Sequence, residues 1–324
     1  MKTLPNPGRN ANDLLNIACY RTIEKHVELT GEPPTGLFFN KILSVLNKEL
    51  EAENTPLGLP HAWYRWGDEV VRILMPSALE WVHEDPPRTV VTWGRDPPEL
   101  PTGVPGYDRL LSRVDSLVTE YSPRGRIEDL VNYVYSYAPF PFQDAYRRLR
   151  NVLLDLKGSE VPLDGLTTTL LLPPLKAAME VFPYGDFPEF GNRPQPFERV
   201  MEALIRADVE GFRFARELSE AFWFAFCYHL RLHPRARQNV PESTVDHWRM
   251  TVETQMVHYD KSFDGILLDA VEALPRFEGE PGVADLAGRA REVREEDLAF
   301  IHGFDRELDE IGKFLAAARR ANPS

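Results

Sequence analysis

Apolar residues recur at intervals of three and four along most of this chain, and this periodicity limits its possible folds more than any other feature. In segment 35–53, TGLFFNKILSVLNKELEAE, the apolar positions are Phe38, Ile42, Val45, Leu46 and Leu50. Residues at this spacing share one face of an α-helix, so that face is buried while Lys41, Lys48 and Glu49 are expected to look outward. The sequence therefore predicts a mainly α protein.

The same periodicity predicts further helices from Asn12 or Asp13 to Thr30, two or three over 107–156, and others over 197–233 and 243–274. The stretch 221–228 is apolar almost all round, which is typical of a helix in the centre of a bundle. A charged helical pattern follows at 284–320. Only RTVVTWG at 88–94 is rich in β-branched residues, so a short β-hairpin or strand is expected there.

The chain is predicted to form two domains. Its 324 residues exceed the size of one ordinary small domain. The segment 157–165, KGSEVPLDG, interrupts the helical spacing of apolar residues and marks the boundary between the domains. We therefore expect a helical N-terminal module over 1–158 and a C-terminal helical domain over 159–324.

Charge and hydropathy restrict the possible partners and the compartment. The chain has 37 Lys and Arg against 50 Asp and Glu, a net charge of −13, so nucleic acid is an unexpected partner except at a local basic patch. Cys19 and Cys227 lie in apolar helical patterns, which indicates buried thiols rather than a disulfide. The N-terminus has no apolar leader region and no run is long enough to span a membrane, so a cytoplasmic protein is expected.

Motifs of common enzyme classes are missing from the sequence. It contains neither GxGxxG nor GxxxxGK, and it has no GxSxG. These glycine-rich patterns are typical of dehydrogenases, nucleotide hydrolases and serine hydrolases, so these classes are set aside.

Histidines in the C-terminal half suggest one alternative, a metal-dependent or nuclease-type effector. His229 and His233 are four residues apart and would face the same way on a helix, where they can share a metal ion. Glu253 and His258 could complete the site. Because the pair directly precedes Pro234, the histidines can instead cap the helix end.

The stretch LPHAWYRWGDEVV, residues 59–71, concentrates aromatic and charged side chains. Gly67 allows a sharp turn, and Asp68 could cap a helix that continues through Val71. One interpretation makes the aromatic residues a wedge between helices, with His61 partly exposed at its rim. The other is an exposed aromatic and Arg surface, because these residue types dominate protein–protein hot spots.

The order of motifs in residues 12–155 resembles the Panacea domain family, which is associated with SocA-type toxin–antitoxin modules. The matching positions are Lys41, Leu43, Leu46, Tyr64, Gly67, Tyr121, Leu130, Val131, Tyr135 and Pro139. The turn is Gly-Asp here, where the family usually has Gly-Pro.

The resemblance implies a mostly helical module that neutralises or chaperones a partner protein, such as a toxin encoded nearby, without catalysis or a cofactor. The residues expected at the contact surface are Lys41, His61, Trp63, Tyr64, Arg65 and Trp66.

Overall fold

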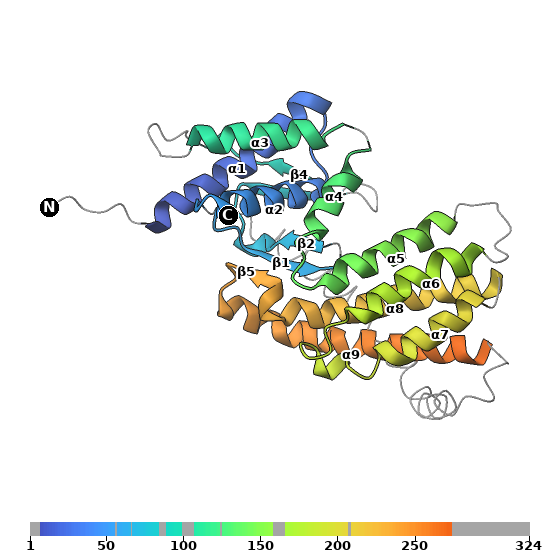
Figure 1. Cartoon of the computed structure of the whole chain (residues 1–324). Helices are drawn as coiled ribbons and strands as arrows, with labels where there is room; N and C mark the ends of the chain where they lie inside the picture. The colour runs from blue at the N-terminus through green and yellow to red at the C-terminus, as the bar shows by residue number, and fades with distance from the viewer. Residues whose placement is uncertain are drawn as a thin grey trace. The chain divides into compact units, whose positions relative to one another are not determined.

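The computed structural model describes residues 7–55, 57–65, 67–83, 89–98, 107–123, 125–157, 166–206 and 209–273 (Figure 1). Most of them are helical and the strands are short, which confirms the predicted mainly α fold. None of the described helices is both long and apolar enough to cross a membrane. The charged pattern at 284–320 lies outside the described residues.

The chain forms two compact units, and each is discontinuous in sequence. The first unit holds the described residues up to Asp144 together with Cys227–Val252, and the second holds Ala145–Phe226 with the described residues from Glu253 onward. This division differs from the predicted boundary at 158/159. The reason is the short strand β5 (Arg237–Gln238), which pairs with a strand more than 170 positions earlier and so returns its segment to the first unit.

Four helices enclose the first unit: α1 (Pro7–Thr30), α2 (Gly36–Ala52), α3 (Tyr107–Tyr121) and α4 (Ile127–Tyr135). Thr35 caps α2, because its side chain accepts a hydrogen bond of 3.2 Å from the Phe38 amide. Helix α2 contacts the other three helices and strands of both small sheets, so it is the central element of this unit (Figure 1).

The stretch around Gly67 is a β-hairpin rather than a turn into a helix. Strand β1 (His61–Tyr64) pairs antiparallel with β2 (Gly67–Val70), with His61 opposite Val70 and Tyr64 opposite Gly67. Strand β5 pairs with the other side of β1. The predicted helix cap at Asp68 is therefore wrong, because Gly67, at φ +89°, begins strand β2 and the pairing with β1 overrides the local capping preference.

A second hairpin confirms the strand expected near residues 88–94. After the 3₁₀ turn η1 (Arg72–Leu74), strand β3 (Leu79–His83) pairs antiparallel with β4 (Thr89–Trp93). Val90 of β4 also bridges to Thr35, directly before α2. This contact attaches the hairpin to the start of the central helix.

The remaining elements are α5 (Pro141–Lys157), α6 (Leu166–Glu180), η2 (Pro188–Phe190), α7 (Pro194–Arg206), α8 (Val209–Leu232), η3 (Pro234–Ala236) and α9 (Glu242–Ala273). Aromatic rings fill the core of the second unit: Tyr146 stacks on Trp223 with centroids 5.4 Å apart, and Phe197 stacks on Phe222 at 4.1 Å. The stretch 221–228 is buried except for Phe224, as its composition predicted. Cys19 and Cys227 are buried and are not joined in a disulfide.

Candidate functional site

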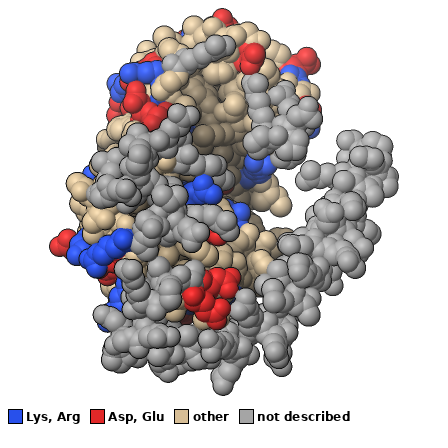
Figure 2. Space-filling view, turned by 90° about the vertical axis from the view of Figure 1, so that its right-hand side faces the viewer, with Lys and Arg blue, Asp and Glu red and all other residues tan. Residues whose placement is uncertain are grey.

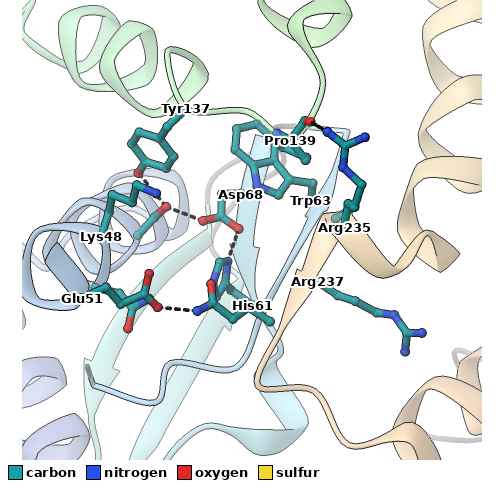
Figure 3. A pocket seen from close by; sticks show the side chains of 13 residues that line it. Lys48, Glu51, His61, Trp63, Asp68, Tyr137, Pro139, Arg235 and Arg237 are labelled. Atoms are coloured by element: carbon teal, nitrogen blue, oxygen red, sulfur yellow. Dashed lines mark hydrogen bonds and ion pairs between the residues drawn. The ribbon is translucent and has the colours of Figure 1, made fainter. Parts of the chain in front are cut away.

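A small polar pocket in the first unit is the candidate site, and we call it the His61 pocket (Figure 3). Its volume is about 190 Å³. Four separate segments line it, namely α2, the β1–β2 hairpin, the residues that follow α4, and the segment of η3 and β5. Such convergence of polar side chains in a cleft is typical of binding and catalytic sites.

Helix α2 contributes a polar stripe to this pocket. Ser44, Lys48 and Glu51 line it and recur at three- and four-residue spacing, so they share one helix face. Lys41 continues the same stripe but is completely buried. The expectation that Lys41 looks outward is therefore wrong, because strand β2 packs against α2 and the Asp68 backbone oxygen accepts a hydrogen bond from Lys41.

A chain of hydrogen bonds runs along the floor of the His61 pocket. Tyr137 Oη lies 2.9 Å from Ser44 Oγ, and Ser44 Oγ donates to Asp68 Oδ2. The other Asp68 oxygen, Oδ1, lies 2.6 Å from His61 Nδ1. Because Ser44 donates its only proton to the carboxylate, Tyr137 donates to Ser44.

The chain continues from His61 to the far side of the pocket. His61 Nε2 lies 3.0 Å from Gln238 Oε1, and Gln238 Nε2 donates to Glu51 Oε1. Asn47 Nδ2 also donates to Glu51 Oε1, at 2.8 Å. Strand β5 is therefore held to β1 and α2 by side chains as well as by its short backbone pairing.

This pattern of donors and acceptors fixes the protonation of His61. The Glu51 carboxylate can only accept, so the Gln238 amide group faces Glu51 and the Gln238 oxygen faces His61. His61 Nε2 must therefore donate to Gln238, while Nδ1 donates to Asp68. With Asp68 ionised both nitrogens donate, and because a neutral imidazole carries only one N–H, this form of His61 is the imidazolium ion.

The electrostatics of the pair agree with this assignment. Burial lowers the pKa of His61, but the Asp68 carboxylate and the hydrogen bonds raise it more, so the pKa lies above its ordinary value. Burial by itself would raise the pKa of the Asp68 carboxyl. The interactions with His61, Ser44 and Lys41 lower it more, so the pKa of Asp68 lies below its usual range. Both shifts favour the charged forms of the pair.

Lys41 supports the hairpin from beneath. Its buried Nζ donates a hydrogen bond of 2.7 Å to the backbone oxygen of Asp68. The same ammonium lies near Gly67 and lowers the pKa of Glu69, although burial raises that pKa more and the net shift is upward. Lys41 is thus a core residue and not the partner-contacting residue that the sequence predicted.

The cluster does not have the order of a nucleophilic triad. In such a triad the histidine stands between the hydroxyl and the carboxylate and takes the hydroxyl proton. Here Asp68 stands between Ser44 and His61, and both His61 nitrogens already donate. The arrangement can fix a pocket wall and present positive charge, but Ser44 and His61 do not form a nucleophile–base pair.

The aromatic residues Trp63 and Tyr64 of the hairpin pack against other rings and do not form an exposed binding surface. Trp63 is buried, and its ring lies edge-on to Tyr135 and Tyr137 with centroids 5.4 and 6.5 Å apart. Tyr64 packs edge-on against Tyr228, whose hydroxyl accepts a 2.7 Å hydrogen bond from Arg65. The prediction of an exposed aromatic surface is therefore wrong for Trp63, because its side chain is in the core. Trp66 lies outside the described residues.

The predicted metal ligands do not assemble into a site. His233 Nδ1 accepts from the Arg235 amide at 3.2 Å and so caps the start of η3, a different contact from the expected capping of the carbonyls at the end of α8. His229 is buried in the same unit, whereas Glu253 and His258 belong to the second unit. Among the described residues, no group of three or more His, Cys, Asp or Glu is placed to hold a metal ion. The proposed ligand set therefore has no support among these residues and stays a prediction.

Basic residues are dispersed on the part of the surface that Figure 2 shows. Among the described residues of that face, Lys and Arg occur in small separate groups interspersed with Asp and Glu. A nucleic-acid backbone binds to extended positive surface. The described residues visible on this face therefore form no extended positive surface of the kind that nucleic-acid binding requires.

Sequence reasoning missed most of the His61 pocket. It placed His61 at a rim but assigned no partner to it, and it gave no role to Ser44, Tyr137 or Gln238. The polar spacing of Lys41, Ser44, Lys48 and Glu51 is a signal that could have revealed the stripe on α2. Gln238 has no local signal at all.

Comparisons with protein-family models, curated proteins and solved structures found no match to this chain. The resemblance to the Panacea family rests on its sequence motifs alone and stays a prediction.

Proposed function

We propose that this chain is a non-enzymatic protein-interaction module whose first unit receives one side chain of a partner protein in the His61 pocket. The size of the pocket is the observation that carries this proposal. At about 190 Å³ it is smaller than the roughly 300–1,000 Å³ typical of sites for drug-sized ligands. It suits a single side chain or a small ion, rather than a nucleotide or an organic cofactor.

The rigidity of the pocket also favours binding. Its floor is a continuous hydrogen-bonded chain, and Asp68 at the centre is almost completely buried. A pocket that is already ordered before binding loses little conformational freedom when a ligand enters. Because His61 donates from both nitrogens, the pocket is better arranged to hold a group than to transfer a proton.

The partner suggested by the motif resemblance is a toxin encoded nearby, so that the chain would act as an antitoxin or chaperone. This proposal moves the contact surface from the aromatic turn to the rim of the His61 pocket. Lys48 is an exposed residue of that rim.

Site-specific photo-crosslinking in cells of the source organism tests the proposal. A photoreactive amino acid replaces Lys48 at the pocket rim, and in a matched control it replaces Thr119, an exposed residue of α3 outside the pocket. We expect a discrete crosslinked protein from position 48 and none from position 119. No adduct at position 48, or equal adducts at both positions, would contradict the proposal.

A further inference from the structure

We infer that the His61 pocket is an anion site, and that the partner side chain it receives is the carboxylate of an Asp or Glu. The second half of this inference rests on the function proposed above. The first half stands on the charge and geometry of the pocket alone.

The charge of the pocket is opposite to that of the chain. Lys48, Arg235 and Arg237 line it together with the His61 imidazolium, against two carboxylates, Glu51 and Asp68. In the whole chain acidic residues outnumber basic ones by 50 to 37. A local excess of positive charge within a strongly acidic protein favours the binding of anions in this pocket.

Each carboxylate of the lining is already engaged within the protein. Asp68 accepts from His61 and Ser44, and Glu51 accepts from Gln238 and Asn47. A cationic ligand would have to compete with these donors for both oxygens of Asp68 and for Oε1 of Glu51. It would also meet the repulsion of the cations around the pocket.

The cations stand on both sides of the floor. In Figure 3, Lys48 and Tyr137 lie on one side, Arg235 and Pro139 lie on the other, and His61 and Asp68 lie between them. Arg235 is held in place because its Nη2 donates a 2.9 Å hydrogen bond to the Pro139 oxygen and its guanidinium stacks over Phe140 at 4.5 Å. Arg237 is drawn to Glu242, at 3.0 Å, and contributes less.

Lys48 is the cation that a ligand can recruit most easily. Its side chain is exposed, and its Nζ lies 5.7 Å from the centroid of the Tyr137 ring, a weak contact that a carboxylate can replace. An ammonium on a flexible stem can close over an entering anion, while Arg235 and His61 stay fixed. A carboxylate side chain is also small enough for the pocket volume.

The test is a titration of the full chain with glutarate, which carries the carboxylate of a Glu side chain, followed by amide chemical shifts in NMR. Glutaramide, its neutral counterpart of similar shape, is the control ligand. We expect saturable shifts in α2 and β5 with glutarate and none with glutaramide. Equal responses to both ligands, or no response to glutarate, would overturn the inference.

Charge variants locate the site. Lys48→Glu is expected to weaken glutarate binding roughly tenfold or more, because it replaces an attractive charge by a repulsive one. Lys48→Gln, which keeps much of the side chain, should weaken it less. Lys176→Glu is the matched control, because Lys176 lies on α6 in the second unit and is 59% exposed. Unchanged affinity in Lys48→Glu would exclude this pocket as the anion site.

The two proposals fail separately. A crosslinked partner at position 48 without glutarate binding would support the protein-interaction role. It would contradict the inference that the pocket receives an Asp or Glu carboxylate. Glutarate binding without any crosslinked partner would support the anion site and contradict the proposed protein-interaction role.

Discussion

Asp68 holds together more of the candidate site than any other single residue. Its carboxylate accepts from Ser44 and His61, and its backbone oxygen accepts from Lys41. All three donors come from residues that are largely or completely buried. The side chain balances positive charge that the interior would otherwise hold uncompensated.

We expect Asp68→Asn to lower the free energy of unfolding of the first unit by about 3–5 kcal/mol, the usual effect of removing one partner of a buried ion pair. Urea titration at neutral pH, followed by hydrogen exchange of β1 and β2 amides, measures it. Asp129→Asn is the control, because Asp129 is 54% exposed and pairs only at the surface with Arg126. Its effect should stay below about 1 kcal/mol. Similar losses in both variants would refute the role of Asp68.

The ion pair should give stability a defined dependence on pH. The pKa of His61 is raised, so its contribution is fully present below the ordinary histidine value of about 6.5 and is lost as pH rises through the raised pKa. The pKa of Asp68 is lowered, so its contribution is present above about 3.9 and is lost as pH falls through the lowered pKa.

We therefore expect the stability difference between the wild type and His61→Gln to shrink as pH rises from about 6 to about 9. Urea midpoints of the first unit at several pH values measure this difference. A constant difference across this range would mean that His61 is neutral in the folded protein.

At the scale of elements, the β1–β2 hairpin depends on Gly67. Its φ is +89°, and a Cβ there would lie 2.9 Å from Tyr135 Cε2 and 3.1 Å from Lys41 Nζ. Only glycine adopts this backbone conformation without strain while leaving room for both side chains. The turn and the floor of the pocket therefore depend on the same residue.

Gly67→Ala is expected to destabilise the first unit by more than the roughly 1–2 kcal/mol that the left-handed conformation alone costs an L-residue. Gly31→Ala is the matched control, because Gly31 also has a positive φ, +76°, with nothing within 4 Å of its Cβ position. Urea unfolding of both variants separates steric crowding from backbone strain. Equal losses would show that Tyr135 and Lys41 adjust without cost.

The helices were the most predictable elements. The apolar spacing in 35–53 predicted α2 and its burial correctly, and the β-branched segment near residue 90 predicted the second hairpin. Residues 67–70 were mispredicted because Asp after Gly is compatible with a helix cap and with a strand after a turn. Only the pairing with β1 decides between them.

At the scale of the whole molecule, the first unit is completed by a distant segment. Cys227–Val252 belongs to it, and Gln238 of β5 joins both His61 and Glu51. A fragment that ends at the predicted boundary of residue 158 would lack this strand. It would also lack Arg235 and Arg237 of the pocket lining.

We expect the fragment 1–158 to be less stable than the first unit in the full chain, with faster hydrogen exchange at the β1 amides. Full-length Gln238→Ala, which removes the two side-chain hydrogen bonds but keeps the strand, should show a smaller change in the same direction. Hydrogen exchange with mass spectrometry compares the three proteins. A fragment that protects β1 as well as the full chain does would show that β5 is dispensable.

The sequence by itself determined the helical class, the position of most helices in the first unit, the second hairpin and the burial of both cysteines. These features follow from apolar spacing and residue preference within one element, which are local properties. The tertiary structure alone decided that Lys41 is buried, that His61 lies between Asp68 and Gln238, and that residues 227–252 join the first unit. These features depend on which distant groups meet, and a hydrogen bond between positions 61 and 238 leaves no periodic trace in either segment.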